Sequence, residues 1–555
     1  MGDNTKRRRH WDSQPFPKQF WWNAYPMVKV GIPFVAGMVV GLRTAGHFTA
    51  WAPAMAIALG VLTVALVYFH FCNYSSVSRR FKSNSFGVAA TLYAFILGCF
   101  LFSYRFHRAE RGVGEAERMV EGVVCAAPVR KPKTWAVEVR RENGSHVLAY
   151  VRVDDADAAQ LPHVGDTVAM RALHWQPTSP HHVDTEDTLG VFAFYHSYLF
   201  YRGVSATCFV PEGQWRLLGN WGGASLSGWR ETAMRTRERI ANHYAAQGLD
   251  GQASSVVAAM TIGQRTGLSP SLRQDFADAG LSHVLALSGF HLTIVLTILN
   301  GLLLRGLLPL AWRRALVVGV VPVLWGYVLL AGSPASLVRA AVIATAGQLC
   351  YCRGQRVGLV NALATAACLM LCIDPFALMD VGFQLSFSSM LGIALVALPV
   401  MRWMGPLPWG VGFVVHIALV TLSATLFTLP LTVLHFGQFA LLGVLANVPG
   451  SLLALGVMWV AVLWWLSALL PWWPAAHAVL GSALAWLANA LVDWADWVGA
   501  LPGAAVTCTI NWPQVAALYA ILLSAVGFVR WRKIWLLETT LAAFIVFGVL
   551  TLFTR

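Results

Sequence analysis

Long apolar runs constrain the fold of this sequence more than any other feature. A run of about 17 to 25 apolar residues can cross a bilayer as a helix. We mark about 13 such runs: 27–42, 51–71, 85–103, 283–304, 315–331, 336–350, 357–373, 383–400, 411–434, 439–468, 477–492, 513–529 and 534–552. Two of them, 336–350 and 477–492, are short enough to be re-entrant or interfacial. Only 12% of the residues are charged, against about 25% in soluble domains, so we predict a polytopic α-helical membrane protein with about 11–13 spans.

The basic residues predict how these spans are oriented. Between Phe102 and Leu281 the chain holds 19 basic and 19 acidic residues, so the net charge of +14 belongs entirely to the other segments. Cytoplasmic loops carry an excess of Lys and Arg, which explains this distribution better than nucleic-acid binding does. If the basic stretch Lys6, Arg7, Arg8 and Arg9 is cytoplasmic, most of the later basic loops fall on the same side. We therefore expect a multi-pass protein of the cytoplasmic (inner) membrane with its N-terminus in the cytoplasm.

The polar segment after the third span predicts a small β-domain outside the cytoplasm. Short alternating stretches at 121–125, 135–139, 146–151 and 167–170 read as strands separated by turns. Several strands in under 100 residues suit a closed OB-like barrel, a fold that often binds single strands through aromatic stacking and a basic groove. The candidate contacts are Arg130, Lys131, Lys133 and Trp135. The alternative is that the aromatic side chain belongs to the core and the charges are solvated.

Four regions follow from these patterns. They are an N-terminal cytoplasmic tail with three spans (1–103), an extracytoplasmic OB-like β-domain (104–228), an amphipathic, interfacial helical neck (229–282) and a membrane-embedded domain (283–555). Cys125 and Cys208 lie near the first and last strands, where an oxidising compartment permits a disulfide between them, with Cys508 as the rival partner. The four cysteines between 350 and 372 differ in depth and side, so we expect no metal site.

Polar side chains at membrane depth carry the functional signal, because such groups usually face a bundle interior or a wet pathway. Ser288 and His291 are three residues apart and are expected to share one face of a helix. Ser333 and Pro334 break the helical pattern shortly before Arg339, a lone cation in an apolar run.

A second polar group follows in the sequence. Asp374, Asp380 and Gln384 are expected to gather with Arg339 near the outer face, as the mouth of an aqueous path. Structural roles remain open for each residue: hydrogen bonds between helices, snorkelling of Arg339, or capping of a helix by Asp380.

Three of these stretches resemble a known family in sequence and order. They are Gly-Leu-Ser-His-x-Leu-Ala-x-Ser-Gly-x-His at 280–291, Ser-Pro-Ala-Ser-x-x-Arg-Ala at 333–340 and Asp-Pro, then Asp-x-Gly-Phe-Gln-Leu-Ser-Phe, within 374–387. Together with the segments around Pro430 and Asn447 they resemble the ComEC family of DNA-internalisation proteins over about 256–450. The resemblance implies passage of single-stranded DNA across the cytoplasmic membrane in natural transformation, through a membrane-embedded competence domain behind an OB-like domain.

Physical reasoning adds a site to this implied function. A charged strand needs a wet path, and sparse polar groups favour anions without trapping them. The expected lining is Ser288, His291, Arg339, Gln384, Ser386 and Asn447, with Ser333, Pro334, Asp374 and Asp380 structuring the mouth.

The expected partners are single-stranded DNA, membrane lipids, an extracytoplasmic DNA receptor, a separate nuclease and a cytoplasmic helicase-like motor. The sequence contains neither an ATP-binding Gly-x-x-x-x-Gly-Lys-Ser/Thr loop nor the His-x-His-x-Asp-His cluster of the metallo-β-lactamase-like domain that longer family members carry. We therefore expect a short-form channel protein with no cofactor and no enzymatic activity.

Two other functions remain open. A small-molecule or lipid transporter would show acidic residues at mid-depth, whereas these acids lie near the ends of spans. An intramembrane serine hydrolase would use Ser288 with a histidine such as His291 as its base.

Overall fold

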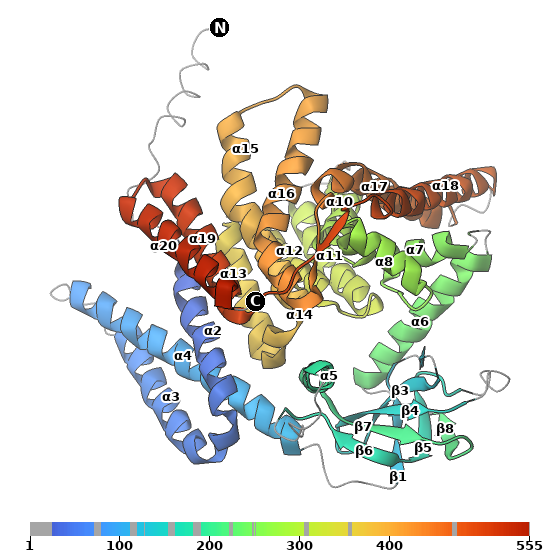
Figure 1. The fold of residues 1–555 in the computed structure, drawn as a ribbon, viewed down its shortest axis with the longest axis horizontal. Coiled ribbons are helices and arrows are strands. Elements are labelled where there is room, and N and C mark those ends of the chain that lie inside the picture. Colours follow the sequence, from blue (N-terminus) through green and yellow to red (C-terminus); the bar gives the residue numbers. More distant parts are fainter. Residues whose placement is uncertain are drawn as a thin grey trace. The chain divides into compact units, whose positions relative to one another are not determined.

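The apolar runs fold as helices in the computed structural model (Figure 1). The structure describes residues 25–71, 79–111, 119–126, 128–131, 133–153, 161–180, 190–220, 226–246, 249, 251–304, 310–352, 358–468 and 474–553. Among these residues, eight helices are long and apolar enough to cross a membrane, and four shorter apolar helices accompany them. The prediction of a polytopic helical membrane protein with a small β-domain is confirmed. The basic stretch Lys6, Arg7, Arg8 and Arg9 lies outside the described residues.

Helices make up most of the described chain. The α-helices are α2 (Pro26–Thr44), α3 (Phe48–Phe71), α4 (Arg79–Arg111), α5 (Gly190–Tyr201), α6 (Leu226–Ala246), α7 (Gly251–Ile262), α8 (Pro270–Asp278), α9 (Ser282–Leu285), α10 (Gly289–Leu304), α11 (Leu310–Leu330), α12 (Ala335–Cys352), α13 (Leu359–Ile373), α14 (Val381–Gly392), α15 (Leu398–Met404), α16 (Trp409–Phe436), α17 (Gly443–Ser467), α18 (Pro474–Gly499), α19 (Trp512–Trp531) and α20 (Ile534–Phe553). Short 3-10 elements are η1 (Ala45–His47) and η4 (Pro375–Met379), and η5 (Ile393–Ala397) is a π-helical turn. Prolines lie inside α2, α3, α11, α16 and α17, as is common in membrane helices.

The chain divides into two compact units, Met1–His107 with Val357–Pro375 and Arg108–Arg356 with Phe376–Arg555. In the first unit, α2 and α4 pack with their backbones in contact. A Cβ at Gly37 would overlap the carbonyl oxygen of Phe95, and a Cβ at Gly98 would overlap that of Phe34. Small residues allow such close approach, which is the usual basis of helix packing in lipid.

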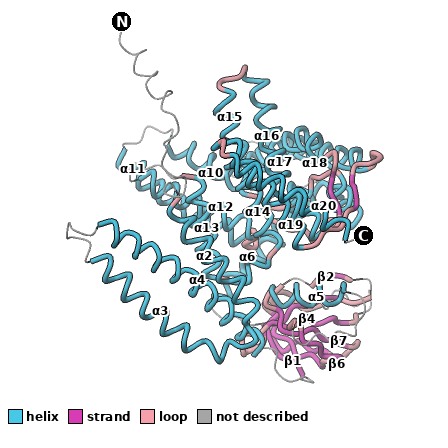
Figure 2. The backbone as a smooth tube through the Cα atoms, turned by 60° about the vertical axis from the view of Figure 1, so that its left-hand side comes forward, coloured by secondary structure: helices cyan, strands magenta, loops and turns pink. Residues whose placement is uncertain are grey.

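The β-domain belongs to the second unit, and Figure 2 shows most of the strands gathered in it. Its strands are β1 (Met119–Val124), β2 (Val129–Arg130), β3 (Trp135–Arg140), β4 (His146–Val151), β5 (Asp166–Arg171), β6 (Leu173–Pro177), β7 (Val204–Val210) and β8 (Trp215–Asn220). These bounds agree with the four predicted strands to within two residues. The remaining strands, β9 (Gln438–Ala440) and β10 (Ala505–Thr507), pair with each other.

The strand order makes this domain a curled, mixed sheet. The order is β6-β7-β4-β3-β1-β5-β8, with β4 and β7 parallel and the other pairs antiparallel. Only Ala172 separates β5 from β6, so one bent segment pairs with β1 at one end and with β7 at the other. This connectivity closes a small Greek-key barrel, the architecture of which the OB-fold is one example. Its interior is apolar and includes Val137, Val147 and Met170.

The structure contradicts the predicted Cys125–Cys208 disulfide, because both sulfurs are thiols. Cys125 follows β1, whereas Cys208 lies on β7, and β3 and β4 separate those two strands. Three strand spacings amount to about 14 Å along the sheet, and a disulfide needs Cα atoms within about 7 Å. Burial raises the pKa of the Cys208 thiol to about 12, even though the charge of Arg141 acts in the opposite direction. Cys508, the rival partner, is an exposed thiol.

The helical neck differs from the interfacial helix that the sequence predicts. It contains α6, α7 and α8, and every residue of α7 from 256 to 262 is buried. Tyr244 of α6 contacts α7 through Thr261 (hydroxyl oxygens 3.1 Å apart) and accepts a hydrogen bond from Trp465 Nε1 of α17 (2.7 Å). The helix α7 is therefore part of the core, since α17 and α18 cover the surface that a lone amphipathic helix would leave for lipid.

Candidate functional site

The first polar stretch interrupts the predicted span 283–304. The short helix α9 ends at Leu285, Ala286 is extended, and α10 begins only at Gly289. Ser288 therefore precedes the helix and does not share a helical face with His291, contrary to the prediction. The two residues still meet, because His291 Nδ1 accepts a hydrogen bond from the Ser288 amide (3.0 Å) and lies 3.2 Å from Ser288 Oγ. The His291 ring closes the first turn of α10, an arrangement that helical spacing alone does not reveal.

Neighbouring elements stabilise this interruption. Ser336 Oγ, at the start of α12, donates a hydrogen bond to the Leu287 carbonyl at 2.6 Å. Gly263 has a φ of 73°, and a Cβ there would lie 2.8 Å from Leu287 Cδ1. Non-helical backbone at membrane depth is tolerated only where protein or a water-filled cavity satisfies it. The interruption is thus a specified feature of the fold.

Arg339 lies in α12 beside this interruption and is only 5% exposed. Its Nη1 donates to the carbonyl oxygen of Ser386 in α14, and its guanidinium carbon lies 5.7 Å from the centre of the Phe387 ring. Nη2 lies 3.3 Å from where a Cβ on Gly289 would stand. The structure therefore brings four of the predicted lining residues together: Ser288, His291, Arg339 and Ser386.

The acidic residues expected near Arg339 make other contacts in the structure. Asp380 caps α14, where its Oδ1 accepts from the Phe383 amide at 2.7 Å, so the capping alternative is confirmed. Asp374 belongs to the first compact unit and lies 3.8 Å from Arg105 Nε. Among the described residues, Arg339 forms no ion pair with a carboxylate. Its positive charge is thus buried with a carbonyl and an aromatic ring as its neighbours.

The predicted helix break at Ser333 and Pro334 is present. Helix α11 ends at Leu330 and α12 begins at Ala335, while Ser333 has a φ of 54°, a left-handed conformation that is uncommon outside glycine. The Ser333 amide donates to the Val328 carbonyl at 2.9 Å, which ends α11. The turn sets the start of α12 and hence the positions of Ser336 and Arg339.

Two residues near Gln384 and Ser388 were not predicted. Gln384 donates to the Leu378 carbonyl (2.9 Å), and its Oε1 lies 2.8 Å from His435 Nε2 of α16. Ser388 and Tyr519 both donate to the Phe427 carbonyl, at 2.5 and 2.8 Å. A His at the end of one apolar run and a single Tyr within another are the sequence signals that could have identified them.

Asn447 lies near the start of α17 and is 5% exposed. Its Oδ1 is buried and accepts no hydrogen bond from a described group. Nearby, α17 packs closely on the Gly280 turn, since a Cβ at Gly280 would lie 2.8 Å from Gly443 Cα and one at Gly450 would lie 2.7 Å from Leu281. Asn447 therefore lies on a helix that packs against the segment leading into α9, and its Oδ1 has no hydrogen-bond donor among the described groups.

The predicted contacts of the β-domain share one hairpin. Arg130 ends β2, Trp135 begins β3, and the two are cross-strand partners. Arg130, Lys131 and Lys133 are exposed and Trp135 is half-buried. The hairpin thus presents three cations beside one aromatic face, a combination that suits single strands but also occurs on ordinary solvated surfaces.

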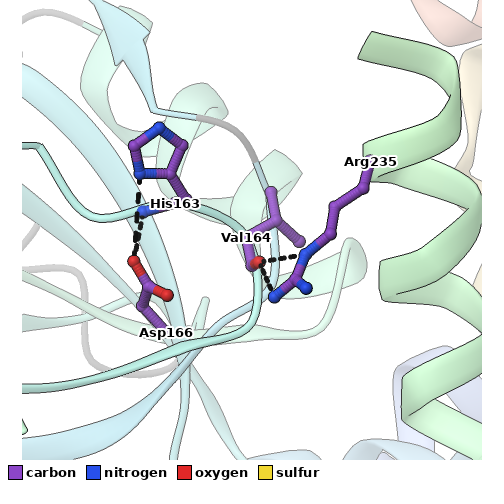
Figure 3. Close-up of polar contacts among 4 residues, drawn as sticks. All are labelled: His163, Val164, Asp166 and Arg235. Carbon is purple, nitrogen blue, oxygen red and sulfur yellow. Dashed lines mark hydrogen bonds and ion pairs between the residues drawn. The ribbon is translucent and has the colours of Figure 1, made fainter. Parts of the chain in front are cut away.

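Other charged groups of the β-domain serve its own structure. Figure 3 shows Arg235 reaching from α6 to the loop at 163–166, where its Nε and Nη2 donate to the Val164 carbonyl at 3.1 and 2.9 Å. Asp166 holds that loop by accepting from the His163 amide at 2.7 Å. Burial alone would raise the pKa of Glu138, but the hydrogen bond and charge of His146 lower it overall. These contacts fix the barrel and its link to α6.

Among the described residues, no group of three or more His, Cys, Asp or Glu side chains could hold a metal ion.

One comparison with known proteins places a family match over this part of the chain. The family model described as "Competence protein" matches residues 260–533. The chain is 29% identical over 206 residues to ComE operon protein 3 of Bacillus subtilis (strain 168). This alignment covers 36% of this chain and 24% of that protein. It is 31% identical over 175 residues to competence protein ComA of Neisseria gonorrhoeae, and this alignment covers 29% of this chain and 24% of that protein. The matched region thus spans about a quarter of each relative. No solved structure matches.

Proposed function

Because residues 260–533 match the competence protein family model and the chain is similar to two competence proteins, we propose that it conducts single-stranded DNA across the cytoplasmic membrane during natural transformation. The path would follow the polar groups around the start of α10, with Ser288, His291, Arg339 and Ser386 along one stretch and Gln384 and Asn447 further along. Ser333, Pro334 and Asp380 would act by setting the helices that carry these groups.

One observation carries this proposal: Arg339 is buried beside non-helical backbone and has no carboxylate partner among the described residues. Burying an unpaired charge is costly in lipid, so ionisable residues at this depth usually mark a substrate or ion pathway. Helices that served only to anchor the chain would not need a buried cation or an interrupted span.

The mechanism requires weak contacts in series. A single strand carries one negative charge per nucleotide, which lipid excludes, so its phosphates must meet water and polar groups along the whole path. Several strong phosphate contacts at once would hold the strand in place, whereas hydroxyl, amide and imidazole groups with one guanidinium allow it to move on. We propose that the chain is a passive conduit, pulled through by a cytoplasmic helicase-like motor.

The orientation and the partners form part of the proposal. The N-terminus would lie in the cytoplasm and the β-domain outside it, where the cationic β2–β3 hairpin would meet the incoming strand. An extracytoplasmic receptor would deliver the DNA, and a separate nuclease would make it single-stranded.

A transformation assay tests this function. A strain lacking the gene receives DNA labelled along one strand, and label inside the cytoplasmic membrane is measured with and without the wild-type chain. We expect no internal label without the chain and restored entry with it. Normal entry in the deletion strain, with no second family member present, would contradict the proposal and favour a small-molecule or lipid transporter.

The contact between Ser288 Oγ and His291 Nδ1 is the one observation that favours a serine hydrolase. However, the same Nδ1 accepts the Ser288 amide, and no described carboxylate hydrogen-bonds to the ring, so the geometry is that of a local cap. Ser288→Ala separates the two functions, since a hydrolase would lose its activity whereas a conduit would keep most of its DNA entry.

A further inference from the structure

The start of α10 has backbone donors without acceptors. The first N–H groups of any helix lack intrahelical partners. In α10 the amides of His291 and Leu292 are directed to the Ser288 carbonyl, and the Ser288 amide is bonded to His291 Nδ1. Among the described groups, none accepts from the amides of Gly289 and Phe290. Phe290 is 48% exposed and Gly289 is half-buried.

Arg339 supplies unused donors at the same point. Nη1 is bonded to the Ser386 carbonyl, but Nε is buried and has no hydrogen-bond partner in the described part of the chain. Nη2 approaches Gly289 closely enough that a methyl group there would stand 3.3 Å from it and 3.1 Å from Ala340 Cβ. Glycine at 289 therefore permits the guanidinium to lie against the first residue of α10.

The charges of this corner all have one sign. The guanidinium carries a full positive charge, the helix start adds about half of one, and no described carboxylate pairs with Arg339. A helix N-terminus with free amides is a favourable site for an oxyanion, and a guanidinium matches the geometry of phosphate oxygens.

We propose that the Gly289 and Phe290 amides and the Arg339 guanidinium form a binding site for one oxyanion, occupied by successive phosphodiester groups of a single strand. This inference rests on the proposed function and specifies the atoms that meet the strand. The donors contact phosphate oxygens and no base, so binding is independent of sequence and weakens as salt rises.

A binding experiment on the purified full chain in a maltoside detergent tests the site. The probes are two fluorescent thymidine oligomers of equal length, one with phosphodiester and one with uncharged methylphosphonate linkages. We expect Arg339→Gln to weaken binding of the charged oligomer by at least about tenfold. The variant should leave the uncharged oligomer unaffected, and Arg339→Lys should retain part of the difference. A preference for the charged oligomer that is equal in wild type and Arg339→Gln would overturn the site.

A matched control is available in α19. Arg530 also lies over an aromatic ring, 5.8 Å from the centre of Trp531, but is exposed near the end of its helix. Arg530→Gln removes the same charge and is expected to leave both affinities unchanged. If it lowers them as much as Arg339→Gln does, the effect is one of net charge and the site is wrong.

A second variant protects the test against misfolding, since Arg339 also links α12 to α14. Gly289→Ala leaves that link intact but inserts a methyl group between the guanidinium and the amides, so it should lower the preference for the charged oligomer several-fold. No loss in this variant would contradict the site.

Phospholipid headgroups share the chemistry of the strand, so a competition arm distinguishes the two sources. Short-chain phosphatidylglycerol should compete with the charged oligomer more weakly than unlabelled oligomer does. Stronger competition by the lipid, lost in Arg339→Gln, would assign the site to lipid and overturn the inference. In cells, normal DNA entry with Arg339→Gln at wild-type abundance would overturn this site alone, whereas normal entry without the chain would overturn the channel.

Discussion

The α2–α4 pair and the corner formed by α10, α12 and α14 differ in how their helices pack. In the α2–α4 pair, glycines bring two backbones into contact, with no side chain between them at Gly37 or Gly98. In the corner, Arg339 and the Ser288–His291 pair lie between helices, and two backbone donors find no acceptor among the groups that the structure describes. Both regions belong to chain segments of apolar composition, so hydropathy does not distinguish them.

The difference suggests a way to distinguish helices that only anchor the chain from helices that carry a functional site. Close packing between small residues stabilises helices in lipid without any polar group. A buried donor without an acceptor does the reverse, because it costs free energy that the fold must recover elsewhere. Regions of the first kind should respond to mutation in stability, and regions of the second kind should respond in function.

The largest stability effect is expected at Gly98. In Gly98→Ala the new methyl group would overlap the Phe34 carbonyl, which is backbone and cannot rotate away, so α2 and α4 must separate. We expect a loss of about 3 kcal/mol in the free energy of unfolding, measured by denaturant titration in detergent. Gly87→Ala, on the same helix with nothing within 4 Å of the new group, should gain up to about 1 kcal/mol. Equal effects of the two substitutions would break the comparison.

Ser336→Ala should give the next largest effect. It removes the donor to the Leu287 carbonyl and leaves that buried oxygen unsatisfied, at a cost of about 2 kcal/mol in the same titration. Ser482 donates to the carbonyl of Ala478 on its own helix and is exposed, so Ser482→Ala serves as the control with almost no cost. If Ser336→Ala is as stable as wild type, the interruption before α10 does not depend on this bond.

Asp380→Ala should cost about 1 kcal/mol, the usual value of an N-cap. The Phe383 amide loses its acceptor and the first turn of α14 frays, which shifts Gln384. Asp380→Ser should restore the stability, because a hydroxyl also caps. Failure of serine to restore it would show that the charge matters, and would return Asp380 to the mouth of the path.

The smallest stability effect, with the opposite sign, is expected at Asn447. No described group donates to its buried Oδ1, so Asn447→Leu should leave the free energy of unfolding unchanged or raise it by about 1 kcal/mol. DNA entry should nevertheless fall, because a polar group of the proposed path is lost. Reduced stability with normal entry would make Asn447 a structural residue and blur the distinction between the two regions.

Local patterns predicted much of this molecule. Alternating apolar and polar residues located four strands of the β-domain, and the Ser-Pro pair located the start of α12. Capping of a helix by Asp380 was one of the roles that the sequence left open. The interruption before α10 was missed because it depends on one backbone amide that bonds to a side chain three residues later. The spacing of apolar residues does not predict such a bond.

The other errors concern distance in space. Cys125 and Cys208 border the same β-domain in sequence, but Cys125 follows β1 and Cys208 lies on β7, and β3 and β4 separate those two strands. Asp380 was expected beside Arg339, but its carboxylate caps α14 instead. Sheet order and helix packing decide such contacts, and neither can be deduced from the spacing of residues.

The parallel pairing of β4 with β7 has a consequence for the order in which the protein matures. Strand β4 ends at Val151, and its partner begins only at Val204. Contacts between residues so far apart form slowly, because the intervening chain must first be brought together. During synthesis, β1, β3 and β4 can form a meander early, but the barrel cannot close until the ribosome has released the chain beyond Val210. Until then the edge of β4 is exposed, so a pause in translation before that point would prolong the stage at which the nascent chain is most prone to aggregate.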